Sequence, residues 1–206
     1  MSSAPAFGIF VGGKGLRMGG TAKANLTFEG RTILERTLDA CAAATRSLYG
    51  SSASPHIWLV GESSAYAAQG VLRVADEPRG VGPIGGLRAF LRGLPPETPG
   101  LAIAGDLPFL TEQLIARLVS EAPVAAALAP RELDGRWQPL FARYDPRVTV
   151  PEIDAALSAG RTSLQHLLAR LAQRALPLEL SATERSCLQD WDRPSDVIAG
   201  CPKSAK

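Results

Sequence analysis

The chain has 206 residues, 46% of them hydrophobic, which is enough to bury an ordinary globular core. Its 22 basic and 20 acidic side chains leave a net charge of +2, so the balance of charge excludes a broad footprint for nucleic acid or for a membrane surface. Three widely spaced cysteines favour a reducing compartment, and no run approaches the roughly 20 apolar residues of a membrane span. We therefore expect a cytoplasmic protein with one domain over residues 1–206, of which 1–5 and 201–206 are flexible tails.

Strands and helices are predicted to alternate in the first half of the chain, which is typical of layered α/β domains with a mostly parallel sheet. Apolar, β-rich runs predict strands at 6–11, 56–60 and 71–75. A capping box at Thr32 and Glu35 predicts the start of a helix that ends near Leu48. A short helix is expected between the second and third strands.

The same alternation continues in the second half. One helix is predicted to begin around Ile84, and another to begin after a Thr111 cap and to end near Ser120. Three further strands are predicted at 101–104, 124–128 and 136–144. The first two are expected to be buried, whereas the pattern of the third indicates a mixed or edge strand.

The C-terminal part is predicted to hold two helices around Gly160. Thr162 and Gln165 indicate a second capping box, and four leucines between 164 and 171 line one face of the helix that follows. The proline-rich stretch 94–100 is interpreted as a short connection between a helix and a strand, not as a domain linker.

A glycine-rich loop follows the first predicted strand, in the stretch "FGIFVGGKGLRMGGTAKANL" (7–26). It does not match a P-loop, which needs Ser or Thr directly after its lysine, because Gly15 follows Lys14. It does not match the dinucleotide fingerprint either, because Met18 stands where the third glycine is required. The loop therefore has a different layout from both of these phosphate-binding motifs.

The chemistry of the loop nevertheless indicates a phosphate ligand. Gly12, Gly13 and Gly15 allow successive backbone N–H groups to converge on phosphate oxygens. Arg17 and Lys23 would neutralise the charge that amides alone cannot. A plain flexible turn is the alternative, but it has no need of these cations.

A single aspartate is the second candidate feature. Asp106, in "GDLP", is predicted to lie just beyond the carboxyl end of a buried parallel strand, where ligands bind in open α/β sheets. Mg²⁺ binds one or two carboxylates together with substrate phosphates, so Asp106 is a candidate metal ligand. The alternative is a carboxylate that merely caps the turn before Pro108.

Six motifs, in this order, resemble the molybdenum cofactor guanylyltransferase-like family of nucleotidyltransferases. They are "GGKGLRMGGTAKANL", "GPIGGL", "GDLPFL", "QPLFARY", "GRTSLQHLL" and "DWDRPSDV". The resemblance covers residues 6 to 198. It implies a single three-layer α/β/α, Rossmann-like domain with a mostly parallel sheet, in which the glycine loop wraps the nucleotide phosphates.

The resemblance also implies roles for individual residues. Asp106 matches the Mg²⁺ ligand, and Asp76 with Gly82 matches the region that contacts guanine and ribose. A carboxylate suits guanine, which offers adjacent N–H donors, although Asp76 could instead form a surface ion pair with Arg79 or Arg88. Gly85 and Gly86 would let the start of a helix approach the nucleotide closely.

The implied reaction transfers GMP from GTP to the terminal phosphate of a molybdopterin-type cofactor and releases pyrophosphate, with Mg²⁺ bound. The product would pass to molybdoenzyme maturation proteins. Three alternatives stay open: the use of CTP, a sugar 1-phosphate as acceptor, and a non-catalytic protein that binds and delivers the cofactor.

The sequence departs from the family's pattern at three places. Gly15 stands where the family usually has Ser or Thr, and Ala22 where Asp or Pro precedes the lysine. Near the C-terminus, Asp190 and Asp192 replace part of a segment that is rich in asparagine in relatives. These two aspartates are candidate acceptor-binding residues, and solvated loop acids are the alternative.

Overall fold

The computed structural model describes residues 4–11, 23–61 and 71–190. Its centre is a seven-stranded sheet in the order β5-β4-β1-β6-β8-β7-β9. The strands are β1 (Ala6–Phe10), β4 (His56–Val60), β5 (Leu72–Val74), β6 (Gly100–Ala104), β7 (Ala127–Ala129), β8 (Phe141–Tyr144) and β9 (Ala175–Pro177). β5, β4, β1 and β6 are parallel neighbours, β8 runs antiparallel to both β6 and β7, and β9 is parallel to β7. The sheet is therefore mostly parallel.

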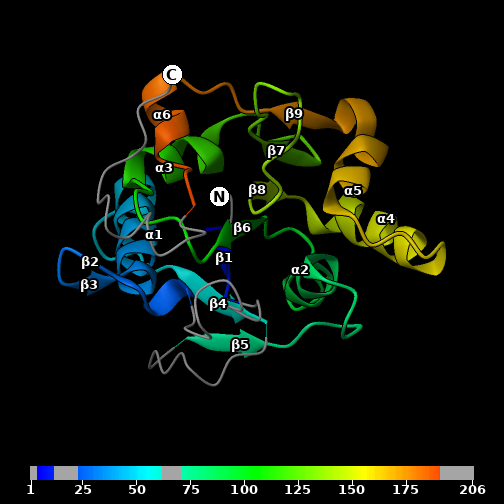
Figure 1. Cartoon of the computed structure of the whole chain (residues 1–206), viewed down its shortest axis with the longest axis horizontal. Coiled ribbons are helices and arrows are strands. Elements are labelled where there is room, and N and C mark those ends of the chain that lie inside the picture. The colour runs from blue at the N-terminus through cyan, green and yellow to red at the C-terminus, as the bar shows by residue number, and fades with distance from the viewer. Residues whose placement is uncertain (1–3, 12–22, 62–70, 191–206) are drawn as a thin grey trace.

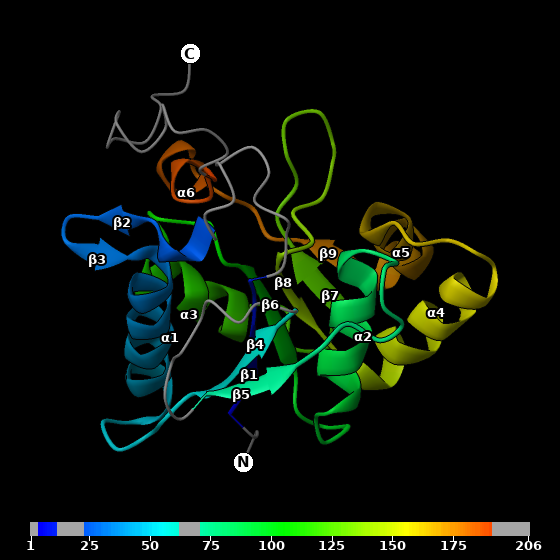
Figure 2. The same ribbon diagram turned by 60° about the horizontal axis from the view of Figure 1, so that its bottom comes forward.

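Helices cover both faces of this sheet (Figure 1). One group lies on the side seen at the left of Figure 2 and consists of α1 (Ile33–Tyr49), α3 (Glu112–Ser120) and α6 (Ala182–Ser186). The other group lies on the opposite side and consists of α2 (Pro83–Arg92), α4 (Pro146–Ser158) and α5 (Leu164–Leu171). Separate apolar clusters fill the two spaces between helices and sheet. The expected three-layer α/β/α architecture is confirmed.

Local sequence signals placed several element boundaries correctly. The Thr32 hydroxyl accepts a bond from the Glu35 N–H at 3.1 Å, and the Glu35 carboxylate accepts one from the Thr32 N–H at 2.8 Å, so the capping box of α1 is confirmed. The Thr111 hydroxyl caps α3 by accepting from the Leu114 N–H at 3.3 Å. The stretch 94–100 joins α2 to β6, as predicted. The short helix expected between β4 and β5 falls outside the described residues.

Two strand predictions in the second half need correction. β7 begins at Ala127, three residues later than expected, and Val124 is 95% exposed. β8 begins at Phe141 and not at 136, and it lies between β6 and β7 as an antiparallel strand of a mixed sheet, so the mixed alternative is confirmed and the edge alternative is wrong. Arg143 on this strand is 3% exposed, and its guanidinium donates to the carbonyls of Leu118 (3.1 Å) and Val119 (2.7 Å) at the end of α3.

The predicted Thr162–Gln165 capping box is wrong. Ser163 is the N-cap of α5, and its hydroxyl accepts from the His166 N–H. Gln165 instead binds Trp137: its side-chain oxygen accepts from the Trp137 N–H at 3.0 Å, and its amide nitrogen donates to the Trp137 carbonyl at 2.7 Å. The side chain pairs with a distant backbone rather than with its own helix start. The leucine stripe of α5 is buried as expected.

Several small elements were not predicted. A hairpin of β2 (Thr27–Phe28) and β3 (Arg31–Thr32) precedes α1, and β9 and α6 follow α5. Glu29 and Gly30, at the turn of the hairpin, both have positive φ, as in a type I′ turn. Among the residues described, no helix is both long and apolar enough to cross a membrane.

Candidate functional site

Four parallel strands end together at one edge of the sheet, which we call the carboxyl edge and define by the ends of β1, β4, β5 and β6. Hydrogen bonds just beyond the strands keep these ends in step. The Val11 N–H donates to the Val60 carbonyl at 3.0 Å, and the Gly61 N–H donates to the Val74 carbonyl at 2.9 Å. The glycine-rich loop leaves the sheet at this edge, directly after Val11.

Asp106 lies at the carboxyl edge, two residues beyond the end of β6, as predicted. Its neighbour Gly105 donates its N–H to the Phe10 carbonyl at 2.9 Å. A Cβ at Gly105 would lie 2.8 Å from the same carbonyl oxygen, so the two chain segments are in close contact. The loop with Asp106 is thereby placed beside the strand that leads into the glycine loop.

The chain returns to this place after the glycine loop. A 3-10 helix spans Lys23–Asn25, and its central residue, Ala24, is 1% exposed. The Ala24 methyl lies 3.5 Å from the position that a Cβ at Gly105 would take. The backbone that carries Lys23 therefore runs beside the backbone that carries Asp106.

Asp76 reaches the carboxyl edge from β5, and its place depends on a glycine in α2. A Cβ at Gly86 would lie 2.8 Å from Asp76 Oδ1 and 2.8 Å from Val60 Cγ1. A Cβ at Gly85 would lie 2.5 Å from the Pro78 carbonyl oxygen. Packing within the protein therefore explains why glycine is required at these two positions, because the segment 76–78 lies directly against the first turn of α2. Their predicted approach to a nucleotide stays a prediction.

The start of α2 lies near this segment. Gly82 is its N-cap, with a φ of +81° that favours glycine, and Pro83 is the first helical residue. Arg88, farther along α2, pairs with Asp154 at 2.6 Å and with Glu77 at 3.3 Å. Of the two arginines considered as partners for Asp76, Arg88 is therefore engaged with other carboxylates.

Some predicted site residues cannot be placed. Gly12, Gly13, Gly15, Arg17 and Asp192 lie outside the described residues, as does the side chain of Lys23. Asp190 is exposed and follows α6. The structure thus brings together the backbone near Lys23 with Asp76 and Asp106 along one edge, and the acceptor role of Asp190 stays a prediction.

The described residues hold no group of three or more His, Cys, Asp or Glu side chains that could bind a metal ion. A single carboxylate at the carboxyl edge would be compatible with Mg²⁺, which can combine one carboxylate with substrate phosphates. Cys41 offers no nucleophile, because complete burial raises the pKa of its thiol. Asp106 is half-buried at the carboxyl edge, and its carboxylate is a donor that fits Mg²⁺.

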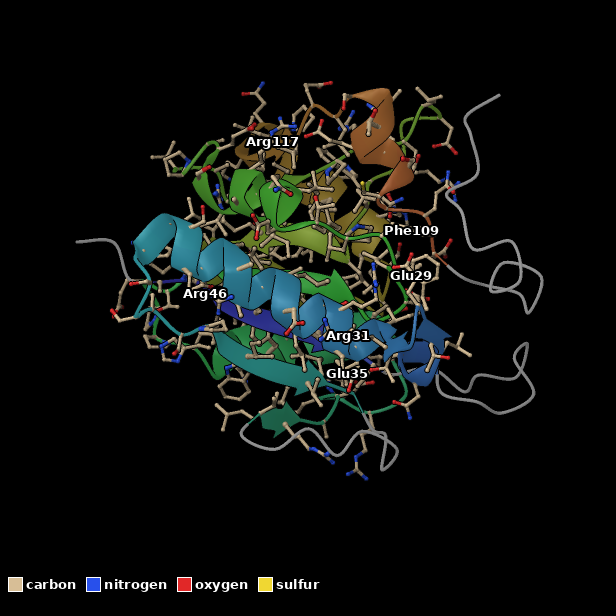
Figure 3. The ribbon with its side chains drawn as sticks, turned by 90° about the vertical axis from the view of Figure 1, so that its left-hand side faces the viewer. Glu29, Arg31, Glu35, Arg46, Phe109 and Arg117 are labelled. Carbon is tan, nitrogen blue, oxygen red and sulfur yellow. The ribbon has the colours of Figure 1, made fainter. Side chains whose placement is uncertain are left out.

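Sequence reasoning missed a cluster that touches the loop with Asp106. Arg36 on α1 donates through Nε to the Pro108 carbonyl at 3.2 Å. Phe109 packs edge-on against Phe28 of the β2–β3 hairpin, with ring centroids 5.4 Å apart. Figure 3 labels Phe109 and Glu29 on the side of the molecule where α1 begins. The Glu29–Gly30 pair between two short β-rich runs was a signal for the hairpin, but nothing local predicted its contact with the loop.

Comparisons with known proteins agree on a family. The model of the MobA-like NTP transferase domain matches residues 8–176. A probable molybdenum cofactor guanylyltransferase of Methanosarcina mazei is 30% identical over 160 residues, which cover 76% of this chain and 70% of that protein. A molybdenum cofactor guanylyltransferase of Pseudomonas putida is 30% identical over 189 residues, or 91% of this chain and 94% of the relative.

Solved structures share the fold. Molybdopterin-guanine dinucleotide biosynthesis protein A from Archaeoglobus fulgidus superposes with a TM-score of 0.70 at 22% identity, covering 95% of this chain and 96% of that one. The 2-C-methyl-D-erythritol 4-phosphate cytidylyltransferase of Thermus thermophilus gives a TM-score of 0.64 at 17% identity, covering 94% and 95%. At these identities the likeness concerns the fold.

Proposed function

The chain belongs to the MobA-like NTP transferase domain family, a family of nucleotidyltransferases, and from this membership we propose that it transfers GMP from GTP to the terminal phosphate of a molybdopterin-type cofactor. Pyrophosphate is the second product. The acceptor follows from the names of the two relatives, which are both molybdenum cofactor guanylyltransferases. In this proposal the protein works in the cytoplasm and hands its product to molybdoenzyme maturation proteins.

The observation that supports this proposal most strongly is the meeting of three segments at the carboxyl edge: the end of β1, the 3-10 helix Lys23–Asn25 and the loop after β6. The Gly105 N–H binds the Phe10 carbonyl at 2.9 Å, and Ala24 packs against the same glycine. The described residues that flank the glycine loop, Val11 and Ala24, thus both lie close to the loop that carries Asp106. A triphosphate in the loop would lie within reach of that carboxylate.

The proposed mechanism relies on alignment and charge. The terminal phosphate of the acceptor is largely dianionic near neutral pH, so it needs no general base to attack the α-phosphorus of GTP. The histidines fit this view, because His56 begins β4 at the opposite edge of the sheet and His166 lies on α5. Arg17 and Lys23 would bind the phosphates, with the backbone N–H groups of Gly12, Gly13 and Gly15.

Asp106 would hold Mg²⁺, which supplies charge neutralisation on the phosphates when bound. Asp76, held against Gly86 at the same edge, would accept the adjacent N–H donors of guanine, with Gly82 near the ribose. Asp190 and Asp192 would contact the acceptor. The proposed contact between Asp76 and guanine is the reason for preferring GTP over CTP as the substrate.

A thermal-shift panel tests the choice of nucleotide. The purified protein is heated with GTP, CTP, ATP or UTP, each with and without Mg²⁺. We expect the largest stabilisation from GTP with Mg²⁺, about 2.7 kcal/mol when the ligand is present at 100 times its dissociation constant. A larger shift with CTP would overturn the role of Asp76, and no shift with any nucleotide would overturn the proposal as a whole.

An aspartate variant tests the metal ligand. Asp106→Asn keeps the shape of the side chain but loses its charge, so it should bind GTP with little dependence on Mg²⁺ and should release pyrophosphate far more slowly when the acceptor is added. Asp39→Asn is the matched control, because Asp39 is exposed on α1 and pairs with Arg31. Turnover that depends on Mg²⁺ as strongly in Asp106→Asn as in the control would remove Asp106 from the mechanism.

A further inference from the structure

The loop of residues 105–110, which carries Asp106, is held by contacts on both sides of this aspartate. Before it, the Gly105 N–H binds the Phe10 carbonyl. After it, the side chains of Leu107 and Leu110 are buried in the apolar cluster on the α1 and α3 side of the sheet. Between these two leucines, residues 108 and 109 make further contacts with other elements.

Arg36 makes the contact in the middle of the loop. Pro108 has no N–H, so its carbonyl is the one backbone hydrogen-bonding group that it offers. That carbonyl accepts from Arg36 Nε at 3.2 Å, across 72 positions in sequence. The contact lies two residues after Asp106, close enough in the chain to influence the backbone on which its carboxylate stands.

The guanidinium of Arg36 is itself held by the β2–β3 hairpin. Its central carbon lies 4.9 Å from the centroid of the Phe28 ring, and its NH1 lies 3.3 Å from a Glu29 carboxylate oxygen. The Phe28 ring also contacts Phe109, at an interplanar angle of 79°. Arg36 therefore lies between the hairpin and the loop and binds both, at the end of α1 seen at the right of Figure 3.

The hairpin connects this cluster to the other side of the proposed phosphate site. It follows the 3-10 helix Lys23–Asn25 in the chain, and the Ile33 N–H closes its base by donating to the Leu26 carbonyl at 2.9 Å. Through the hairpin, Arg36 links the segment that contains Lys23 to the loop that contains Asp106. The two groups proposed to handle the triphosphate and its metal are thereby held in one frame.

We propose that Arg36 is a positioning residue for Asp106. It fixes the loop of residues 105–110 against the β2–β3 hairpin, and so sets the position of the carboxylate at the carboxyl edge. The inference rests on the proposed function and extends it. An arginine suits the task because one planar group donates to a carbonyl, stacks on a ring and pairs with a carboxylate at once, which the point charge of a lysine does not reproduce.

The expected effect is on the requirement for Mg²⁺. Loss of a hydrogen-bonding group behind a metal-binding residue typically weakens metal affinity by about 10-fold to 100-fold. In Arg36→Met the half-saturating concentration of MgCl₂ for the GTP-induced thermal shift should thus rise about 10-fold or more. Arg36→Lys, which keeps the charge and a donor, should raise it less.

Hydrogen exchange gives a second readout that needs no ligand. In the intact protein without nucleotide, the amides of residues 105–110 should exchange faster in Arg36→Met than in the wild type, while amides in β6 keep their rate. Arg46→Met is the matched control: Arg46 is exposed in the last turn of the same helix and is labelled in Figure 3. It should leave both readouts unchanged.

The outcomes separate this inference from the proposed function. If the wild type shows the GTP shift and both Arg36 variants need no more MgCl₂ than Arg46→Met, the positioning role is wrong. If the wild type shows no shift with any nucleotide, the proposed function fails and the metal role of Arg36 fails with it, while unchanged exchange would also refute the structural contact. Faster exchange in the loop together with a raised MgCl₂ requirement would support the proposal.

Discussion

At the scale of a single residue, the absence of a side chain at Gly86 decides where Asp76 lies. Gly86 is buried in the first turn of α2, and a Cβ there would lie 2.8 Å from both Asp76 Oδ1 and Val60 Cγ1. Such distances are shorter than real Cβ contacts. Close packing at the carboxyl edge therefore requires glycine at this position, although glycine lowers the helix propensity of α2.

The Gly86→Ala variant tests this view by the sign of its effect. Inside a helix the change ordinarily stabilises by about 1 kcal/mol. Here we expect a loss of about 1–3 kcal/mol from overpacking, measured as the free energy of unfolding in urea, and weaker binding of GTP because Asp76 is displaced. Ala155→Gly on the exposed side of α4 is the reference for ordinary propensity and should cost about 1 kcal/mol. A stabilised Gly86→Ala protein would refute the packing argument.

At the scale of elements, one carboxylate joins α6 to α3. Glu184 accepts from Arg117 NH1 at 2.5 Å, and from the N–H (2.9 Å) and hydroxyl (2.8 Å) of Ser181. Arg117 also donates to the Glu179 carbonyl at 3.0 Å. The Arg117 bond, followed by the Ser181 N–H, lowers the pKa of Glu184 to about 2. The attachment of the C-terminal segment thus depends on a charged carboxylate.

The protein should therefore lose stability at low pH, where Glu184 becomes protonated. The folded-state pKa of about 2 lies below the ordinary value of 4.5, so the ionised form favours the folded protein. This contribution is present above about pH 4.5 and is lost as the pH falls from there towards 2. We expect Glu184→Gln to lose about 1.5 kcal/mol at pH 7 and to show a smaller further loss between pH 5 and 2.

Urea unfolding at a series of pH values measures this dependence. Glu179→Gln, an exposed carboxylate on the same segment, is the control and should follow the wild type. Parallel curves of stability against pH for Glu184→Gln and the wild type would show that the Arg117 pair does not contribute.

At the scale of the whole molecule, one sheet unites the two halves of the chain. The apolar cluster on the α1 and α3 side contains Phe7 and Leu188, and the cluster on the other side contains Ala6 and Leu168. β1, from the start of the chain, pairs with β6 in the middle of the sheet. If the strands of one half of the chain unfolded alone, buried side chains of the other half would be exposed to water. We therefore expect the chain to unfold as one cooperative unit.

Two tryptophans can report on this cooperativity. Trp58 on β4, in the first half of the chain, packs against Phe90 with ring centroids 6.3 Å apart. Trp137, in the second half of the chain, is 7% exposed. Fluorescence of the Trp137→Phe and Trp58→Phe variants, each also with Trp191→Phe, should give urea transitions that coincide with each other and with far-UV circular dichroism. Separate transitions for the two reporters would show that the chain unfolds as two domains.

Features that depend on neighbours in sequence were predictable. The capping box at Thr32 and the cap at Thr111 were confirmed, and the β-rich run 56–60 coincides with β4. The position of Asp106 beyond β6 followed from the rule that parallel strands end at one edge of a sheet. These signals are local hydrogen bonds and side-chain periodicities, which a short stretch of chain carries by itself.

Features that depend on contacts between distant residues were decided by the tertiary structure alone. Gln165 hydrogen-bonds to the Trp137 backbone instead of to the start of its own helix. The buried Arg143 on the interior strand β8 donates to carbonyls at the end of α3. The contact of Arg36 with Pro108 joins residues 72 positions apart. Hydrogen-bonding groups select partners by position in space. The sequence by itself therefore determined most of the larger elements and the edge where the proposed site lies, while the fold decided the small elements and which side chains hold that site in place.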